Sequence, residues 1–210
     1  MGKSGMSADQ STVGWGGIVD CVAGHRFAPK LDRFIFLRHG QTDGNAAGIY
    51  QPADLPLNAK GEAQARAAGE LLGSHKIGRI VASPMPRAWK TANTVASHHG
   101  VEPEVEVALQ ERIFLRLWGS RIGVLDWSKD PAGCERLSAF VGRVANAFER
   151  VLVEPPEGAP QGHDLLVVAH GGVLLVLTAL IGLDAANIPR GNAIALRVER
   201  AGGSWKMNPV

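Results

Sequence analysis

The sequence predicts an α/β fold, a three-layer α/β/α arrangement around a mostly parallel sheet with one antiparallel edge. Short apolar runs with the length of buried strands alternate along the chain with longer segments of helical periodicity. That alternation is typical of parallel strands joined by helices that pack on the sheet. The clearest helix signal is residues 135–153, where apolar residues recur at spacings of 3, 4 and 7.

The individual elements follow from apolar runs, caps and breakers. Asn58 is expected to cap a helix, and Pro84 to stand in the first turn of a helix that Gly100 ends. The remaining helix is expected at residues 172–181. The expected strands are residues 34–37, 79–82, 105–109 (strand or extended loop), 165–169, 192–198 and a short one near Trp205. Residues 40–56 are predicted to be a polar loop, and residues 110–132 have no regular pattern.

Two domain-level expectations follow. Residues 1–31 are rich in Gly and Ser without a sustained period, and predict an irregular N-terminal extension. Residues 32–210 predict one domain large enough for its own core.

Residues 165–183 could be misread as a membrane span, because these 19 residues carry no Asp, Glu, Lys or Arg. The sequence His170-Gly171-Gly172 interrupts them. A buried strand, a glycine turn and a buried helix explain the same hydropathy, and we prefer that interpretation. No signal peptide is recognisable at the N-terminus.

Composition is ordinary for a soluble protein, with 45% hydrophobic and 20% charged residues and a net charge of +2. Acids and bases are mixed along the chain, which argues against nucleic-acid or membrane partners. Cys21 and Cys134 have neither metal-ligand spacing nor the number for a disulfide framework. A reducing, cytoplasmic location is the simpler expectation.

Polar residues follow three of the expected strands directly. Arg38-His39-Gly40 ends the first, Ser83-Pro84 with Arg87 ends the second, and His170-Gly171-Gly172 ends the strand at 165–169. Each could be a solvated loop if taken alone. If the strands are parallel neighbours, however, all three junctions meet at one edge of the sheet. Two arginines, two histidines and helix N-termini would then form a pocket suited to a phosphoryl group.

A phosphate pocket with histidine at its centre suggests covalent catalysis. One of the two histidines would attack phosphorus through a neutral ring nitrogen, giving a phosphohistidine. The other histidine and the arginines would stabilise charge on the equatorial oxygens. A carboxylic acid is expected nearby, because the leaving alkoxide needs a proton.

The motifs, in their order along the chain, resemble those of the histidine phosphatase superfamily, which includes the cofactor-dependent phosphoglycerate mutases. The resemblance covers residues 33 to about 200. Its motifs are Arg38-His39-Gly40-Gln41-Thr42 with Asn45, residues 57–65, residues 83–88 with Thr91-Ala92, residues 109–112 and residues 168–172.

The resemblance implies a role for each matching position. His39 resembles the phosphorylated nucleophile, and Arg38, Arg87 and His170 resemble the phosphate pocket, with Asn45 as a hydrogen-bond donor. Gly171 is expected to contact the substrate, and it stands where some relatives carry an acidic Asp. Glu111 is therefore the better candidate for the proton donor that later activates water. The family requires no metal, and no cofactor is expected.

Departures from the family pattern concern the substrate side. Ile49 and Pro52 stand where relatives usually have Arg and Gly, and only 58 residues separate Glu111 from His170. A short apolar cap near residues 112–132 favours a phosphatase over a mutase. The function expected is metal-independent hydrolysis of a small phosphomonoester. The alternatives are a cofactor-dependent phosphoglycerate mutase and an inactive phospho-ligand-binding protein. The oligomeric state stays open, a homodimer included.

Overall fold

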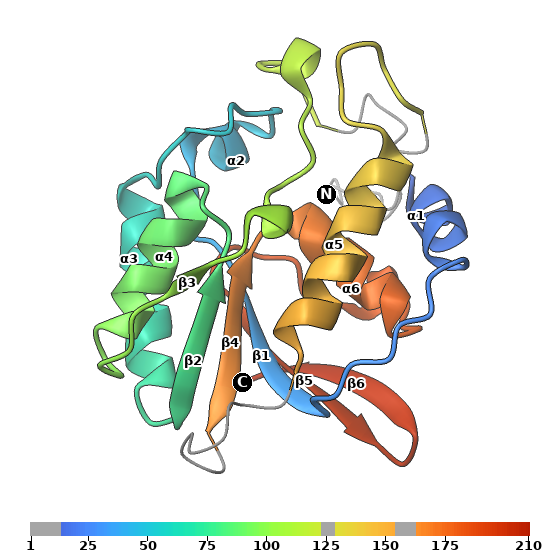
Figure 1. Cartoon of the computed structure of the whole chain (residues 1–210). Helices are drawn as coiled ribbons and strands as arrows, with labels where there is room; N and C mark the ends of the chain where they lie inside the picture. Colours follow the sequence, from blue (N-terminus) through green and yellow to red (C-terminus); the bar gives the residue numbers. More distant parts are fainter. Residues whose placement is uncertain (1–13, 123–128, 154–162) are drawn as a thin grey trace, which may run out of the picture.

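The computed structural model describes residues 14–122, 129–153 and 163–210, and it contains one six-stranded sheet (Figure 1). The strands lie in the order β3-β2-β4-β1-β5-β6. Their bounds are β1 Arg33–Arg38, β2 Ile77–Ala82, β3 Glu104–Val105, β4 Asp164–Ala169, β5 Ala195–Ala201 and β6 Ser204–Pro209. The α-helices are α1 Trp15–Val22, α2 Asp43–Ala47, α3 Ala59–Leu72, α4 Pro86–Ala96, α5 Leu137–Val151 and α6 Gly171–Leu180. Short 3₁₀ turns are η1 Val107–Leu109, η2 Leu115–Leu117 and η3 Ala185–Asn187.

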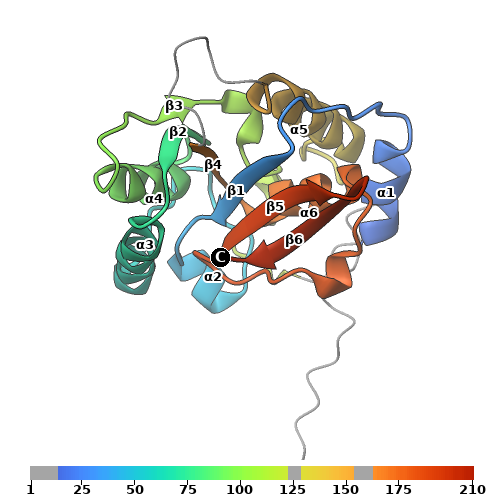
Figure 2. The ribbon, with the colours of Figure 1, turned by 90° about the horizontal axis from the view of Figure 1, so that it is seen from below.

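The sheet is the middle of three layers, as predicted (Figures 1 and 2). Alternate residues of the buried strands face opposite layers, so Ile35 and Leu37 contribute to one core cluster while Phe34 and Phe36 contribute to the other. Helices α3 and α4 cover the first face, and α1, α5 and α6 cover the second. Strand β4 is buried along its whole length, because it lies between β2 and β1 with helices on both faces.

Strands β3, β2, β4 and β1 run parallel, and β5 runs antiparallel to both β1 and β6. The expected antiparallel edge is therefore confirmed. In the register of β1 and β5, Leu37 pairs with Ala195 and Arg33 with Glu199. The residues just before β5 consequently lie at the same sheet edge as the residues just after β1.

The prediction that residues 1–31 are irregular is wrong for residues 15–22, which form α1. Ile18 and Val22 are one helical turn apart, and both are buried against α5 and α6. A helix of 8 residues is too short to show a sustained period in the sequence. The domain boundary at residue 32 stays a prediction.

Three local boundaries also differ from expectation. Helix α4 begins at Pro86 rather than at Ser83, because the chain stays extended through its N-cap residue Met85. The predicted polar loop contains the one-turn helix α2, which Thr42 caps through the backbone N–H of Asn45. The expected strand at 105–109 is the two-residue β3 followed by η1.

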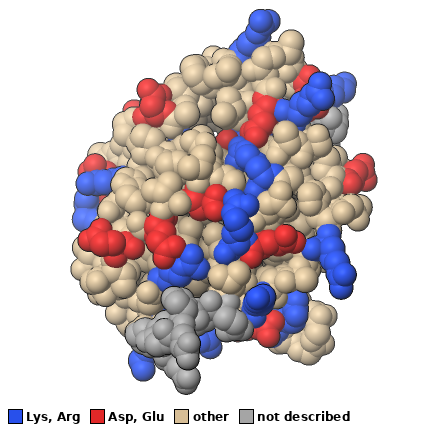
Figure 3. Space-filling model, viewed as in Figure 1, with Lys and Arg blue, Asp and Glu red and all other residues tan. Residues whose placement is uncertain are grey.

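The segment that resembled a membrane span forms β4, a glycine-bearing turn and α6. Within the described ranges, no helix has both the length and the apolar character needed to cross a bilayer. Acidic and basic side chains are interspersed on the face shown in Figure 3, as their mixed order along the chain leads one to expect.

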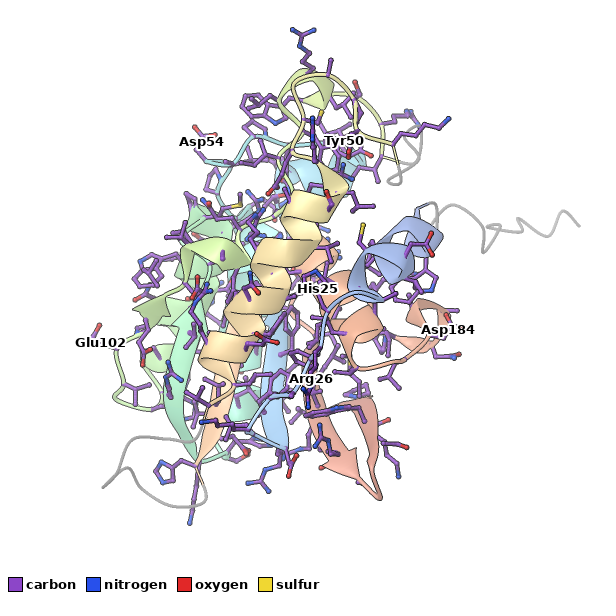
Figure 4. All side chains as sticks on the ribbon, turned by 45° about the vertical axis from the view of Figure 1, so that its right-hand side comes forward. His25, Arg26, Tyr50, Asp54, Glu102 and Asp184 are labelled. Atoms are coloured by element: carbon purple, nitrogen blue, oxygen red, sulfur yellow. The ribbon has the colours of Figure 1, made fainter. Side chains whose placement is uncertain are left out.

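A short cap, of which the structure describes residues 112–122 and 129–136, stands beyond the carboxyl ends of the strands (Figure 1). Isolated antiparallel β-bridges pair the backbone of Phe114 with that of Cys134 and the backbone of Ile49 with that of Arg121. The Tyr50 ring lies 4.8 Å from the Phe114 ring, between the α2 loop and the cap (Figure 4). Trp118 is half exposed, and residues 123–128 of the cap lie outside the described residues.

Candidate active site

The three predicted strand ends do meet. Arg38 pairs with Ala169 across β1 and β4, and Ala82 pairs with Val168 across β2 and β4. His39 and His170 each come one residue later, and their ring centroids lie 5.1 Å apart. The sheet register therefore places the two histidines side by side.

His39 is only 2% exposed, and its Nδ1 lies 2.7 Å from the carbonyl oxygen of Gly40. A carbonyl only accepts hydrogen bonds, so this contact places the proton on Nδ1 and leaves a lone pair on Nε2. Burial, and then the charges of Arg87 and Arg38, lower the pKa of His39 well below its usual value of 6.5. The ring is therefore a neutral imidazole at neutral pH, with the nucleophilic nitrogen available.

Gly40 is required by close packing rather than by a special backbone angle, since its φ is outside the left-handed region. A Cβ at this position would lie 2.3 Å from the carbonyl oxygen of Gly61 in the first turn of α3. The Gly40 N–H donates to Thr91 Oγ1 at 3.2 Å, and that hydroxyl donates to the carbonyl of Arg87 at 2.7 Å. The loop after β1 is thus fixed against both α3 and α4.

Arg87 is buried and Arg38 is half-buried in the pocket, and each has a buried Nε–H without a hydrogen-bond partner among the described residues. Arg87 Nη1 donates to the carbonyls of Pro52 and Ala53, at 3.2 and 3.0 Å. Burial, partly offset by the charge of Glu111, lowers the pKa of Arg87 to about 10, so it stays a cation at neutral pH. Pro52, the departure from the family pattern, therefore orients an arginine through its backbone.

His170 is fully buried, and its Nε2 lies 2.8 Å from the hydroxyl oxygen of Ser83. Its Nδ1 is buried without a hydrogen-bond partner among the described residues. Burial, and then the charges of Arg87 and His39, lower its pKa well below 6.5. Three polar groups of one pocket, Nδ1 of His170 and the two arginine Nε–H groups, thus lack a partner from the protein.

Glu111 reaches this pocket from the loop after η1. Its Oε2 accepts from the backbone N–H of Gly172 at 2.9 Å, in the first turn of α6. Gly172 comes two residues after His170, so this contact places the Glu111 carboxyl group beside the pocket. The predicted role of proton donor requires such a position.

Arg143 of α5 holds the Glu111 loop in place and was not singled out in the sequence. Its guanidinium donates to the carbonyl of Gln110 at 2.8 Å and to that of Glu111 at 3.2 Å. It also forms an ion pair with Glu135 at 2.6 Å. The only sequence signal was a cation on a helix that is otherwise strongly amphipathic.

The remaining predicted positions lie near the same loop. Gly171 lies against Arg38, where a Cβ would be 3.5 Å from the guanidinium carbon. Asn45 accepts at Oδ1 from the Thr42 N–H and from Asn192 Nδ2, at 3.2 and 3.1 Å. Asn192, which the sequence did not indicate, also donates to the carbonyl of His39 at 3.0 Å.

All predicted site residues are therefore in one region, built on neighbouring strand ends. Across the described ranges, no group of three or more His, Cys, Asp or Glu side chains is arranged to hold a metal ion. Around the two histidines, the cations Arg38 and Arg87 outnumber the one carboxyl group, Glu111, and this excess of positive charge favours an anionic ligand.

A family model for the histidine phosphatase superfamily (branch 1) matches residues 34–209. The chain belongs to the histidine phosphatase superfamily. That match spans both strand-end histidines and confirms the resemblance seen in the motifs.

Relatives in this superfamily include phosphatases. Glucosyl-3-phosphoglycerate phosphatase of Mycobacterium tuberculosis is 33% identical over 178 residues, which are 76% of this chain and 80% of that protein. Adenosylcobalamin/alpha-ribazole phosphatase of Salmonella typhimurium is 30% identical over 173 residues, 74% of this chain and 83% of that protein. These relatives agree with the expected place in the phosphatase branch rather than among the mutases.

A solved structure of one of these phosphatases is also similar to this chain. The mycobacterial glucosyl-3-phosphoglycerate phosphatase in complex with VO3 has a TM-score of 0.68 and 29% identity, covering 85% of this chain and 97% of that one.

Agropine synthesis reductase of Rhizobium rhizogenes is 30% identical over 187 residues, 84% of this chain. The matched part spans only 41% of that reductase.

Proposed function

We propose that this histidine phosphatase superfamily member hydrolyses a small phosphomonoester, without a metal, through a covalent phosphohistidine at His39. The observation that carries the proposal is the group of buried, unpartnered nitrogens around a neutral histidine. Unpaired buried donors are unfavourable by roughly 1–3 kcal/mol each, so groups of this kind mark a place for an acceptor. Arg38 Nε and Arg87 Nε are such donors, and His170 Nδ1 is a third in the tautomer that carries its proton there.

In the first step, the phosphoryl oxygens accept hydrogen bonds from Arg38, Arg87 and His170. His39 Nε2 attacks phosphorus, forming the P–N bond as the P–O bond to the leaving group breaks. Glu111 gives its proton to the departing oxygen. The Gly40 carbonyl holds the Nδ1 proton of His39 throughout, which stabilises the positive charge on the ring.

In the second step, Glu111 takes a proton from water, and the resulting oxygen nucleophile attacks the phosphorus of phosphohistidine. The P–N bond breaks, inorganic phosphate forms, and His39 is again a neutral imidazole. One carboxyl group therefore serves as acid and then as base, which returns the protein to its starting state.

Hydrolysis is favoured over the phosphoglycerate mutase reaction by two features. The relatives named above are phosphatases, and the cap of residues 112–136 is short. The relatives' own substrates do not identify the substrate of this chain, which we expect to depend on the cap side chains near residues 112–132. We extend the proposal only to small phosphorylated molecules, and we expect a cytoplasmic enzyme.

The test is turnover of p-nitrophenyl phosphate combined with trapping of acid-labile phosphate on the protein. His39→Ala should lose about 10⁴-fold or more in kcat and all acid-labile labelling. His98→Ala, at the exposed end of α4, is the matched control and should retain both. A chelator should leave turnover unchanged.

Three results would contradict the proposal. The first is undiminished turnover by His39→Ala. The second is phosphoryl transfer between phosphoglycerates without release of phosphate, which would identify a mutase. The third is tight binding of a phosphorylated ligand without hydrolysis of any phosphomonoester, which would identify an inactive binding protein.

A further inference from the structure

The loop before β5, residues 190–194, contacts the Arg38 side chain and the backbone carbonyls of Arg38 and His39. Arg38 Nη1 donates to the carbonyl of Arg190, and the Ala193 N–H donates to the carbonyl of Arg38 at 3.0 Å. Ala193 has a φ of +54°, a left-handed conformation that is unfavourable for a residue with a Cβ. Such a conformation persists where surrounding contacts determine it, and here the Ala193 N–H donates to the carbonyls of Arg38 and of His39, the proposed nucleophile.

Asn192, at the centre of this loop, makes two hydrogen bonds with the same atom. Its Nδ2 donates to the carbonyl of His39 at 3.0 Å and to Oδ1 of Asn45 at 3.1 Å. One side chain therefore links the backbone of the nucleophile to the amide of Asn45.

The orientation of both amide groups follows from two backbone atoms whose roles are unambiguous. The His39 carbonyl can only accept, so the atom of Asn192 that faces it is the nitrogen. The Thr42 N–H can only donate, so the atom of Asn45 that faces it, at 3.2 Å, is the oxygen. An amide flipped at either residue would place donor against donor or acceptor against acceptor.

Both acceptor positions of Asn45 Oδ1 are then occupied, by Thr42 and by Asn192. The Asn45 amide nitrogen is the group left to interact with a ligand, and it can only donate. A donor beside His39 strengthens the binding of a phosphoryl oxygen, because a hydrogen bond to an anion is stronger than a neutral one.

We propose that Asn192 is a positioning residue, which holds the Asn45 amide with its nitrogen toward the phosphoryl group while fixing the backbone of His39. This inference rests on the proposed function, since it assigns the ligand to the His39 pocket. Asn192 itself does not contact the reacting atoms and acts through Asn45.

The experiment measures the affinity of inorganic phosphate and orthovanadate by calorimetry, alongside kcat and KM for p-nitrophenyl phosphate. The variants are Asn192→Ala, which removes the amide, and Asn192→Asp, which keeps its size but replaces the donor by an acceptor. Asn187→Ala is the control, because Asn187 is exposed at the end of η3. Circular dichroism and thermal melting establish that each variant is folded.

We expect Asn192→Ala to weaken phosphate binding about 10-fold, within the range of one hydrogen bond to an anion. Asn192→Asp should weaken it at least as much, since one carboxylate oxygen would then face both the His39 carbonyl and Asn45 Oδ1, and the new negative charge would repel the anion. Unchanged phosphate affinity in a folded Asn192→Asp protein overturns the proposal, whatever the stability of the Ala variant.

A double-mutant cycle with Asn45→Ala then tests whether Asn192 acts through Asn45. In the Asn45→Ala background, Asn192→Ala should weaken phosphate binding less than about 3-fold. The same 10-fold loss in both backgrounds would contradict a role through Asn45. Because binding is measured without turnover, this outcome is separate from the His39→Ala result: active His39→Ala would overturn the hydrolytic mechanism while the binding cycle still decides the role of Asn192.

Discussion

The parallel strands and the antiparallel strand contribute to one sheet edge in different ways. β1, β2 and β4 bring the residues that follow them, Arg38-His39, Ser83 to Arg87 and His170. β5 runs the other way, so it brings the residues that precede it, 190–194. A search of the residues after each strand finds the first group and misses the second.

The two groups also differ in chemistry. The parallel strand ends supply cations and imidazoles, which bind and react with an anion. The loop before β5 supplies a carbonyl that accepts from the Arg38 guanidinium, and an N–H and a carboxamide that donate to the backbone of Arg38 and His39 and to the Asn45 side chain. The difference indicates a division between reacting groups and groups that orient them, and the following experiments test it from the largest expected effect to the smallest.

Glu111→Gln should have the largest effect, because it removes the proposed proton donor, which is one of the reacting groups. We expect kcat to fall about 10²- to 10⁴-fold for an alkyl phosphate. The loss should be much smaller for p-nitrophenyl phosphate, whose leaving group needs no proton. Steady-state kinetics with both esters gives the comparison.

The control for this variant is Glu102→Gln, since Glu102 projects from the surface on the loop before β3 (Figure 4). It should be as active as the unmodified chain. An equal loss for both esters in Glu111→Gln would mean that Glu111 does not protonate the leaving group.

Gly40→Ala should disturb the fold of the parallel strand ends. The new Cβ would lie 2.3 Å from the backbone oxygen of Gly61, and neither backbone can yield without moving α3 or the His39 loop. Overpacking of this kind lowers the free energy of unfolding by about 3 kcal/mol. Urea denaturation measures it, with Gly24→Ala as control because no atom lies within 4 Å of the corresponding Cβ. Equal midpoints for the two variants would show that the loop can adjust.

The free energy of unfolding should decrease as the pH is lowered below about 6.5, because His39 and His170 have folded-state pKa values well below the usual 6.5. Below pH 6.5 the unfolded chain binds protons at these histidines and the folded chain does not. The contribution of the two neutral histidines to stability is therefore fully present above that pH and decreases as the pH falls toward the folded-state pKa values. Each group contributes up to about 1.4 kcal/mol per pH unit.

Urea denaturation between pH 7.5 and 5.5 checks this expectation. His170→Asn should flatten the decrease by up to about half, whereas replacement of the exposed His98 should leave it unchanged. A curve of the same slope in His170→Asn would mean that other groups cause the acid sensitivity.

Ala193→Gly should have the smallest effect, at the antiparallel edge. Glycine relieves a left-handed residue with φ of +54° but is more flexible in the unfolded chain, so the net gain should be about 0.5 kcal/mol. The melting temperature should therefore rise by about 1–2 °C, which a thermal melt measures. A clear loss of stability would show that the Ala193 methyl group makes a needed contact.

Much of the parallel part of the site is readable in the sequence for a physical reason. A buried strand is a short apolar run, so the ionisable residues that end it are conspicuous, as at Arg38-His39 and His170. Sequence order alone then places them together once the strands are parallel neighbours. The family resemblance adds Glu111, which no strand end would have indicated.

Other features depend on information that is not local. Asn192 becomes relevant only through the direction of β5, and Arg143 only through the packing of α5 beside the Glu111 loop. The one-turn helix α2 and the short helix α1 contain too few residues for a period to appear. Gly40 looked like a turn residue, whereas its neighbour across space, Gly61, explains it.

The backbone of the pocket is part of the central sheet itself. The His39 N–H bonds to the carbonyl of Ala169 and the Ser83 N–H to that of Val168, each at 3.0 Å. These amides can exchange with solvent only when β4 separates from its neighbours. This part of the pocket backbone therefore has no low-energy opening of its own, and the hydrogen-exchange protection of these two amides should match that of the core.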